Sequence, residues 1–357
     1  MRRSAISLHL WLGLILGFFW ALQGLTGSIL VLHREADRLV NPALASGATG
    51  PWLPLESLVA AAGVKAERIT IVDSARNSLA IHHGKADSRR AVIVEAATGT
   101  ILGDRAVTAP QPDREGIFRW LFLLHHELLA GDLGETILGI SALFLFSSLL
   151  LGLWIATPWR GLFRISAWRT SRIRLWGWHR MVGVLAALAL LPLSLTGAYL
   201  IWGKELRAAA ATVWPMQLPP EGKSTLAGPA IGLDRAWAIA NGQFPDATFV
   251  SATLPGPKAA AYKFRLHQPG EARALFGVTA VWVDGASGTI SYRYDPLDAA
   301  AANRVIDSLF AIHSGEIAGW PGRLAVLAAG LSLPMLWITG LWAWLRAQKR
   351  RNRPIPA

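Results

Sequence analysis

The segment Arg180-MVGVLAALALLPLSLTGAYLIWG-Lys204 places twenty-three uncharged residues between two cations. About 20 apolar residues of α-helix cross the hydrocarbon core of a bilayer, so this segment predicts a transmembrane helix. Three more windows between charged residues have the same character: thirty residues between Arg3 and Arg34, twenty-four between Glu135 and Arg160, and twenty-two between Arg323 and Arg346. The predicted fold class is a membrane α-helical protein with four transmembrane helices.

The composition excludes several classes of protein. Of the 357 residues, 52% are hydrophobic and 16% are charged, against about 25% charged residues in an average soluble domain. These values exclude a disordered chain and argue against an ordinary cytosolic enzyme. Cysteine is absent, which excludes disulfides, thiolate metal sites, iron–sulfur clusters and covalent haem attachment through Cys-X-X-Cys-His.

The net charge of +12 falls on one side of the predicted spans. Three segments contain arginine and lysine but no acidic residue; their cations are Arg2, Arg3, Arg160, Arg164, Arg169, Arg172, Arg174, Arg346, Lys349, Arg350, Arg351 and Arg353. Cytoplasmic segments carry such an excess, so both termini are predicted to be cytoplasmic. The basic runs predict contacts with lipid headgroups and not with nucleic acid. The first apolar stretch is far longer than the 7–15 residues of a signal-peptide core, which predicts a retained helix.

Recurring residues indicate an internal duplication. Leu25-Thr26-Gly27 recurs as Leu195-Thr196-Gly197, and Gly152-Leu153-Trp154 recurs as Gly340-Leu341-Trp342. Residues 94–101 (VEAATGTI) resemble residues 283–290 (VDGASGTI). The chain is therefore predicted to hold two copies of a unit made of helix, outer segment and helix, with both copies in the same orientation across the membrane.

The two outer segments are too long to be simple connections. Each combines one helical pattern with three or four strand patterns and a tight turn that contains Gly99 or Gly288, which predicts two small extracytoplasmic α+β domains, facing the periplasm or the exterior. The predicted order is transmembrane helix one at 1–33, outer domain 34–118, an outer amphipathic helix with transmembrane helix two at 119–159, a basic cytoplasmic loop at 160–178, transmembrane helix three at 179–204, outer domain 205–305, an outer amphipathic helix with transmembrane helix four at 306–346, and a basic cytoplasmic tail at 347–357.

Four histidines stand at matching places in the two copies. His9 and His179 lie at the predicted cytoplasmic ends of the first and third spans, and His125 and His313 lie just outside the second and fourth. Ionisable groups at membrane depth are costly and tend to be functional. A b-type haem in a helical bundle needs two axial histidines from facing helices, so His9 with His179 and His125 with His313 are predicted as axial ligands of two b-type haem irons.

Other histidines leave alternatives open. A lone histidine near a helix end is usually an interfacial residue, and only the pairing favours a ligand here. His33 and His126 lack a histidine at the matching place in the other copy, and either could replace an assigned outer ligand. His82, His83 and His267 fall in predicted strands and are expected to face solvent. No nucleotide-binding motif is present, so a reductant must come from outside this chain.

The chain resembles the PepSY-associated transmembrane family. The resemblance covers nearly the whole chain and is carried by His9 with Trp11 and Gly13, by Leu-Thr-Gly at 25–27, by Leu124-His125, by Trp178-His179-Arg180, by residues 309–315 (LFAIHSG), and by the turns at 94–99 and 283–288. The resemblance implies that both outer domains are PepSY-like. Some members are similar to di-haem inner-membrane reductases of ferric siderophores, which implies the same role for His9, His125, His179 and His313, with no further catalytic side chain assigned.

Three functional hypotheses follow. The first is a haem-dependent oxidoreductase that passes electrons across the membrane to a periplasmic ferric siderophore or other ferric chelate, releasing Fe(II) for uptake; its electron donor would be a quinol or a cytoplasmic reductase. The alternative is a non-enzymatic, membrane-anchored PepSY protein that binds or regulates an extracytoplasmic partner. A haem or metal permease is the weakest, because the four spans offer no intramembrane acidic or basic side chain for a polar pathway.

Overall fold

The computed structural model describes residues 1–44, 47–48, 50–72, 77–85, 87–160, 162–163, 171–220, 228–257 and 259–351. The predicted basic residues Arg164, Arg169 and Arg353 lie outside this set. The chain forms two compact units. A helical unit comprises Met1–Leu32, Phe122–Leu206 and Ile312–Ala357, and a sheet unit comprises His33–Leu121 and Arg207–Ala311.

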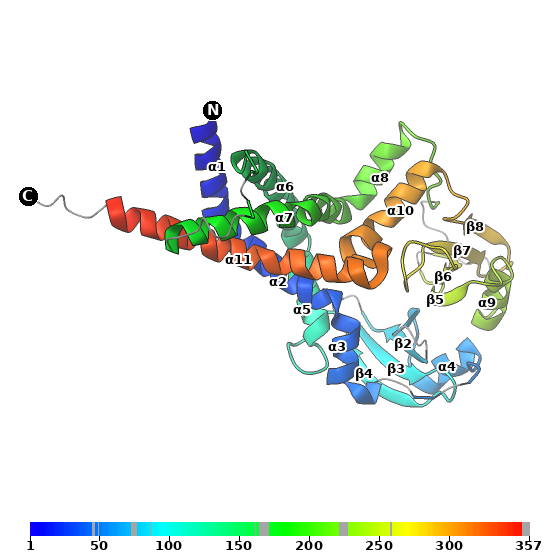
Figure 1. Cartoon of the computed structure of the whole chain (residues 1–357). Coiled ribbons are helices and arrows are strands. Elements are labelled where there is room, and N and C mark those ends of the chain that lie inside the picture. Colours follow the sequence, from blue (N-terminus) through cyan, green and yellow to red (C-terminus); the bar gives the residue numbers. More distant parts are fainter. Residues whose placement is uncertain are drawn as a thin grey trace, which may run out of the picture. The chain divides into compact units, whose positions relative to one another are not determined.

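The helical unit contains the predicted spans (Figure 1). Its helices are α1 (Arg2–Ile15), α2 (Gly17–Val31), α6 (Asp132–Ile155), α7 (Ser171–Ile201) and α11 (Gly319–Arg351), with parts of α5 (Ile117–Glu127), α8 (Gly203–Ala211) and α10 (Ala301–Ser314) and the short turn η3 (Glu316–Ala318). Three stretches are long and apolar enough to cross a membrane: Asp132–Ile155, Arg174–Ile201 and Glu316–Lys349. Three of the four predicted spans are thus confirmed as helices that could cross a membrane.

The remaining predicted span is bent. Helices α1 and α2 meet at Leu16 with a 60° change in direction, where the sequence predicted one continuous helix. Glycine favours helix kinks, and Gly17 begins α2. The two pieces also have different partners, because α1 packs on α6 and α2 packs on α11. The bend therefore lets each piece follow the helix that it contacts.

Small residues bring α2 and α11 close together. A Cβ atom on Gly24 would collide with the carbonyl oxygen of Gly330, and the Ser28 hydroxyl donates a 3.0 Å hydrogen bond to the Leu327 carbonyl. Small residues at such an interface allow the backbones of two membrane helices to approach and to gain van der Waals contact and interhelical hydrogen bonds. This contact fixes the end of α2 that carries Thr26.

The sheet unit is built on one antiparallel sheet of eight strands in the order β4-β3-β2-β1-β5-β6-β7-β8. The strands are β1 (Arg68–Ile71), β2 (Ser78–His83), β3 (Arg90–Glu95), β4 (Ile101–Ala106), β5 (Thr248–Thr253), β6 (Ala261–His267), β7 (Thr279–Asp284) and β8 (Ile290–Tyr294). The two predicted outer domains are not separate, because β1 pairs with β5 and joins their sheets edge to edge. Pairing removes two exposed sheet edges, which would otherwise present unpaired backbone groups.

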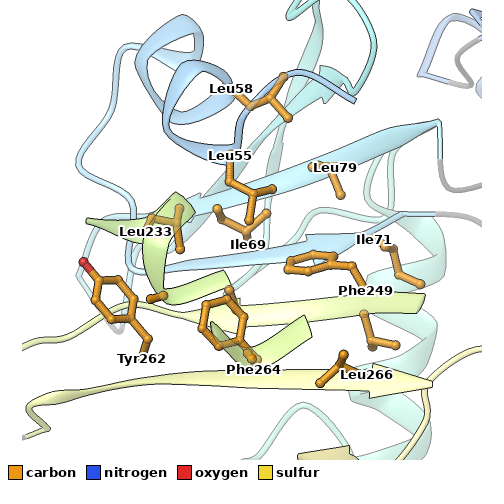
Figure 2. Close-up of a cluster of buried hydrophobic side chains, with 14 of the residues drawn as sticks. Leu55, Leu58, Ile69, Ile71, Leu79, Leu233, Phe249, Tyr262, Phe264 and Leu266 are labelled. Carbon is orange, nitrogen blue, oxygen red and sulfur yellow. The ribbon is translucent and has the colours of Figure 1, made fainter. Parts of the chain in front are cut away.

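Two short helices cover one face of the sheet and bury its apolar side chains. Helix α4 (Leu55–Ala62) precedes β1, and α9 (Leu233–Asn241) precedes β5. Burial alternates along β6, so that Tyr262, Phe264 and Leu266 enter the core while Lys263 and Arg265 lie on the opposite face. Figure 2 shows this core, in which Leu58, Ile69, Leu79 and Phe264 are fully enclosed.

Each of these helices caps the other. The Glu56 carboxylate of α4 accepts a 2.6 Å hydrogen bond from the backbone N–H of Leu233, and Asp234 of α9 accepts a 2.7 Å hydrogen bond from the N–H of Leu55. A carboxylate at a helix N-terminus satisfies an unpaired backbone donor and interacts favourably with the helix dipole. The exchange ties the two halves of the sheet unit together above the β1–β5 junction.

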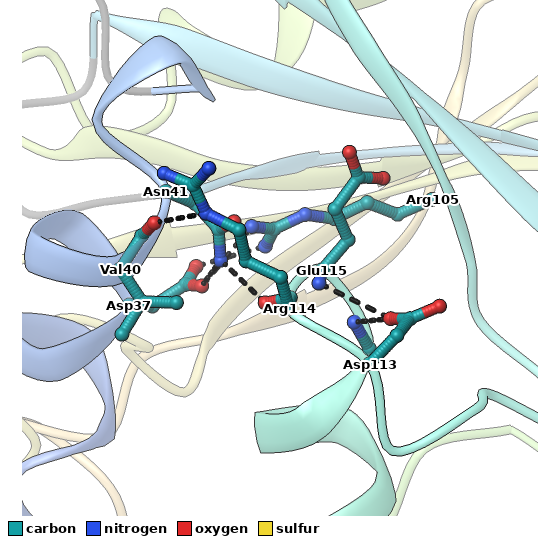
Figure 3. A network of polar contacts seen from close by, with 8 residues as sticks. Asp37, Val40, Asn41, Arg105, Asp113, Arg114 and Glu115 are labelled. Atoms are coloured by element: carbon teal, nitrogen blue, oxygen red, sulfur yellow. Dashed lines mark hydrogen bonds and ion pairs between the residues drawn. The ribbon is translucent and has the colours of Figure 1, made fainter.

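A polar network fixes the segment that leads into α5 (Figure 3). Arg105 of β4 donates to both carboxylate oxygens of Asp37, at 2.8 and 3.0 Å, and Asp37 lies in α3 (His33–Val40); the turn η1 (Pro42–Leu44) follows α3. Asn41 donates to Asp37 and to the Arg114 carbonyl, at 2.7 and 2.9 Å. Asp113 accepts from the N–H of Gly116 at 2.7 Å. These contacts define where α5, which carries His125, begins.

Candidate functional site

Two of the predicted ligands face each other at one end of the helical unit. His9 lies in α1 and His179 lies near the start of α7, and their ring centres are 6.3 Å apart with the ring planes at 75°. Metal–imidazole bonds are about 2 Å long and the ring centre lies roughly 1 Å behind the bonding nitrogen, so two imidazoles on opposite sides of one metal ion have centres roughly 6 Å apart. The spacing of this pair fits such an arrangement.

Hydrogen bonds set the orientation of both rings. His9 Nδ1 lies 3.0 Å from the carbonyl oxygen of Ser148, which can only accept, so Nδ1 carries the proton. His179 Nδ1 lies 3.0 Å from the Thr339 hydroxyl, and that hydroxyl donates its own proton to the Met335 carbonyl at 2.8 Å. The Thr339 oxygen is therefore the acceptor for His179. Both rings keep Nε2 unprotonated, as a metal ligand must be.

The second pair repeats this arrangement. His125 of α5 lies with Nδ1 3.0 Å from the hydroxyl of Thr26 in α2, and that hydroxyl donates to the Leu22 carbonyl at 2.9 Å. His313 of α10 lies with Nδ1 3.0 Å from the hydroxyl of Thr196 in α7, which donates to the carbonyl of residue 192 at 2.8 Å. Both imidazoles are again Nδ1–H donors with Nε2 available.

A glycine lies against each of the four rings. A Cβ atom on Gly27 would come 2.9 Å from the Cε1 atom of His125, and one on Gly152 would come 3.1 Å from that of His9. The corresponding distances are 3.3 Å from Gly197 to His313 and 3.5 Å from Gly340 to His179. Three of these glycines, Gly27, Gly197 and Gly340, directly follow the threonine that accepts a hydrogen bond from the same ring. The glycines allow each imidazole to lie flat against a neighbouring helix.

The two pairs lie at opposite ends of the helical unit. Helix α7 contributes His179 near its start and Thr196, which holds His313, near its end. At a rise of 1.5 Å per residue, these positions are separated by roughly 25 Å along the helix, which approaches the ~30 Å thickness of a bilayer core. The four buried hydroxyl residues that hold the rings, Thr26, Ser148, Thr196 and Thr339, are each less than a tenth exposed.

A basic, aromatic hollow is lined by residues from the start of α7 and from the C-terminal part of α11. Its volume is about 300 Å³. It is lined by Arg174, Leu175, Trp178, Trp342 and Arg346, and the Arg346 guanidinium lies 4.8 Å from the centre of the Trp342 ring. Trp178 directly precedes His179 in α7. The hollow thus offers two cations and flat apolar faces to a planar group that carries negative charge.

One of the two alternative ligands, His126, is engaged elsewhere. His126 Nδ1 lies 3.2 Å from a carboxylate oxygen of Glu135, and its ring stacks on Phe122 with centres 5.2 Å apart. His126, Glu127 and Glu135 together place three possible metal-ligand atoms within 4.8 Å of one another. His33 begins α3 in the sheet unit, whereas His125 and His313 belong to the helical unit. In the described part of the chain, His126 does not repeat the contact with a threonine hydroxyl.

The strand histidines differ from expectation, because all three are half-buried. His82 Nε2 lies 2.9 Å from the Thr70 hydroxyl of the neighbouring strand. Burial, followed by the nearby Arg68, lowers the pKa of His82 to about 4. These rings belong to the sheet and lie in the other unit from the two pairs.

Sequence reasoning missed the residues that hold the rings. Thr26 and Thr196 were noticed only as a recurring Leu-Thr-Gly, and Ser148 and Thr339 were not singled out. A signal was present: within the apolar windows, Thr-Gly occurs at 26–27, 196–197 and 339–340. A threonine followed by glycine offers an acceptor and a flat surface side by side, which is what an orienting contact to an imidazole requires.

Comparison of the sequence with curated proteins found no match. The family described as the PepSY-associated TM region, in contrast, matches residues 6–347. The match spans both units and all four paired histidines. The chain therefore belongs to the PepSY-associated transmembrane family, as the sequence resemblance indicated.

Proposed function

We propose that this protein is a di-haem b-type oxidoreductase of the bacterial inner membrane that reduces a ferric chelate. The observation that carries the proposal is the shared state of four histidines. In each, Nδ1 is held as a donor by a buried acceptor and Nε2 is left free. Orienting hydrogen bonds of this kind accompany metal-ligating histidines and tune the metal that they bind.

The chain's own residues fit b-type haem at both ends. His9 with His179, and His125 with His313, would supply the nitrogen ligands of the two haem irons, and no cysteine is needed because b-type haem is not covalently attached. Bound haem supplies reversible one-electron chemistry at iron. Ser148, Thr26, Thr196 and Thr339 fix the tautomer and orientation of the imidazoles. Arg174 and Arg346 offer cations for haem propionates, in a hollow that is also lined by Trp178, the residue before His179.

The positions of the pairs suit electron transfer across a bilayer. Under the positive-inside assignment, His9 and His179 lie toward the cytoplasm and His125 and His313 toward the periplasm. Both termini are then cytoplasmic and the sheet unit is periplasmic. A quinol or a cytoplasmic reductase would be the donor. The acceptor would be a ferric siderophore or another ferric chelate: one electron converts Fe(III) to Fe(II), which binds hard oxygen ligands more weakly and is released for uptake.

The test is an absorption spectrum of the purified full chain, oxidised and dithionite-reduced, with a pyridine haemochrome assay. The expected result is sharp b-type bands and about two haems per chain. His125→Ala and His9→Ala should each remove one haem and leave the other. His267→Ala, which removes a histidine from strand β6, is the matched control and should keep both.

A colourless protein from haem-replete cells would refute the proposal. It would favour the alternative, in which a membrane-anchored PepSY protein binds or regulates an extracytoplasmic partner, and in which the paired histidines can be replaced without effect. Retention of both haems in His125→Ala would show instead that His33 or His126 is the outer ligand.

A further inference from the structure

The face of the sheet opposite α4 and α9 carries two rows of side chains in register. The first row crosses five strands: Arg68, Thr253, Lys263, Trp282 and Tyr292 are successive cross-strand partners. The second row is Thr70, Ser251, Arg265, Ala280 and Tyr294. Directly opposed residues on one face of a sheet are in contact range. This face therefore presents cations on β1 and β6 beside aromatic rings on β7 and β8.

The small residues of the second row leave a hollow of about 330 Å³. Ser251 and Ala280 are the cross-strand neighbours of Arg265, and their short side chains leave space on both sides of its guanidinium. The hollow is bordered by Arg207 of α8 and Asp307 of α10, and all of its lining residues belong to the sheet unit. Its volume is at the small end of the range for ligand pockets, about 300–1,000 Å³.

The lining is strongly electropositive. Arg68, Arg207, Lys263 and Arg265 oppose a single carboxylate, that of Asp307. Asp307 is already bound by Arg207 at 3.3 Å and by the Tyr294 hydroxyl. Within the described part of the chain, no hydrogen bond or salt bridge engages the guanidinium group of Arg68 or of Arg265. Burial, followed by Arg68, lowers the pKa of Arg265, and the negative charges of Glu271 and Asp307 oppose this shift only in part.

The aromatic side of the hollow is a continuous surface. The Trp282 and Tyr292 rings have centres 5.0 Å apart, and Tyr292 and Tyr294 stack at 6.4 Å with planes within 3°. The Lys263 ammonium lies 3.9 Å from the centre of the Trp282 ring. Aromatic rings next to cations suit a ligand that is itself both aromatic and anionic, because stacking and ion pairing then act together.

We propose that this hollow binds an aromatic, polyanionic ferric chelate of the catecholate class. The identification of the ligand as a ferric chelate rests on the proposed function, whereas the preference for an aromatic anion rests on the lining of the hollow alone. The Fe(III) complex of three catecholates is a trianion with flat rings at its surface. A trihydroxamate complex of the same size is neutral and lacks those rings, so the site discriminates against it.

The experiment measures binding to the full chain in detergent by calorimetry, with a hexadentate tris-catecholamide complex of Ga(III). Ga(III) matches Fe(III) in charge but is not reduced, so the measurement is independent of haem and of turnover. The neutral Ga(III) trihydroxamate complex is the comparison ligand. We expect the catecholamide complex to bind at least tenfold more tightly, with an affinity that falls as salt rises.

Variants localise the site. Arg265→Gln should weaken binding about tenfold, as expected for a charge-assisted contact, and Arg265→Lys should restore part of it. Trp282→Leu should weaken it by a similar factor. Arg293→Gln is the control: Arg293 also lies on β8, but its guanidinium lies over Phe244, a residue of the core on the other face. Arg293→Gln should leave the affinity unchanged.

The possible results separate the proposed binding site from the proposed function. Equal affinity for the two complexes, an unchanged affinity in Arg265→Gln, or a loss equal to that of Arg293→Gln would overturn the inference. If Arg265→Gln does not fold, Arg68→Gln makes the same test at an exposed position of the hollow. Reduction of ferric chelates without Ga(III) complex binding would refute the site and leave the proposed function standing. If the Ga(III) catecholamide complex binds but the chain carries no haem, the proposed function is refuted and the binding site stands.

Discussion

The glycines against the paired imidazoles give a graded test of the site. Replacing Gly27 by alanine places a Cβ atom 2.9 Å from His125 Cε1, about half an ångström closer than ordinary contact at 3.4 Å. The same substitution at Gly340 places the atom 3.5 Å from His179 Cε1, which is ordinary contact. Gly152→Ala and Gly197→Ala, at 3.1 and 3.3 Å, lie between them.

The size of the effect follows from the geometry. Overpacking of this kind costs about 1–3 kcal/mol, which the better helix propensity of alanine offsets by about 1 kcal/mol. The energy of folding therefore changes little. The ring is what can move, and a displacement of several tenths of an ångström is large against a metal–nitrogen bond of about 2 Å. Disturbing an orienting contact of a ligating histidine typically costs 10–100-fold in metal affinity.

The assay is haem content per chain, with the spectrum of the reduced protein and a thermal melt as a control for folding. Gly27→Ala should lose the haem assigned to His125 and His313 and retain the other. Gly340→Ala should retain both, and the two intermediate variants should fall between, in the order of their distances. Equal haem content in Gly27→Ala and Gly340→Ala, with both chains folded, would refute the steric reasoning.

Further expected outcomes test the contacts one at a time. Thr26→Val removes the acceptor for His125 Nδ1 and should weaken the outer haem 10–100-fold, while Thr136→Val, whose hydroxyl bonds only its own helix, should not; equal haem retention would contradict the role given to Thr26. Because the pKa of His82 is lowered to about 4, the unfolded chain takes up a proton before the folded one as pH falls from 6.5, so stability should decline between pH 6.5 and 4 by on the order of 2 kcal/mol; a His82→Gln chain melted over the same range should show a smaller decline. Asn303 is fully buried and exchanges two hydrogen bonds with the backbone of Gln217, at 3.0 and 2.9 Å. Asn303→Ala should therefore lower the free energy of unfolding by about 2–4 kcal/mol. An unchanged denaturation midpoint would show that this contact is not kept in solution.

Much of the helical unit could be read from the sequence because its signals are local. Uninterrupted apolar windows mark three spans, and the structure places helices on them. The bend at Leu16 could not be read, because the window between Arg3 and Arg34 is uniformly apolar and the change in direction comes from the different partners of α1 and α2. The joining of the two predicted outer domains was equally hidden, since pairing of β1 with β5 links residues almost two hundred positions apart.

The candidate site also combines residues that the sequence identified with residues that only the structure revealed. Recurring residues in the two halves of the chain identified His9, His125, His179 and His313, and the structure brings His9 and His179 to a ring spacing of 6.3 Å. The sequence did not reveal that Ser148 and Thr339 would hold those two rings, because an apolar helix contains many serines and threonines and only packing decides which hydroxyl meets an imidazole. The alternatives His33 and His126 were open in the sequence for the same reason.

The sequence by itself therefore determined the membrane class, the apolar spans and the identity of the paired histidines, because hydrophobic length, charge and residue type are properties of the chain. Tertiary structure alone decided the tautomers of the rings, the glycine surfaces beside them and the cationic–aromatic rows on the sheet. Each of these depends on which side chains meet across helices or strands that are distant in sequence. The register of β5, β6 and β7 places Arg265 between Ser251 and Ala280, and nothing local to any of these strands specifies that they lie side by side.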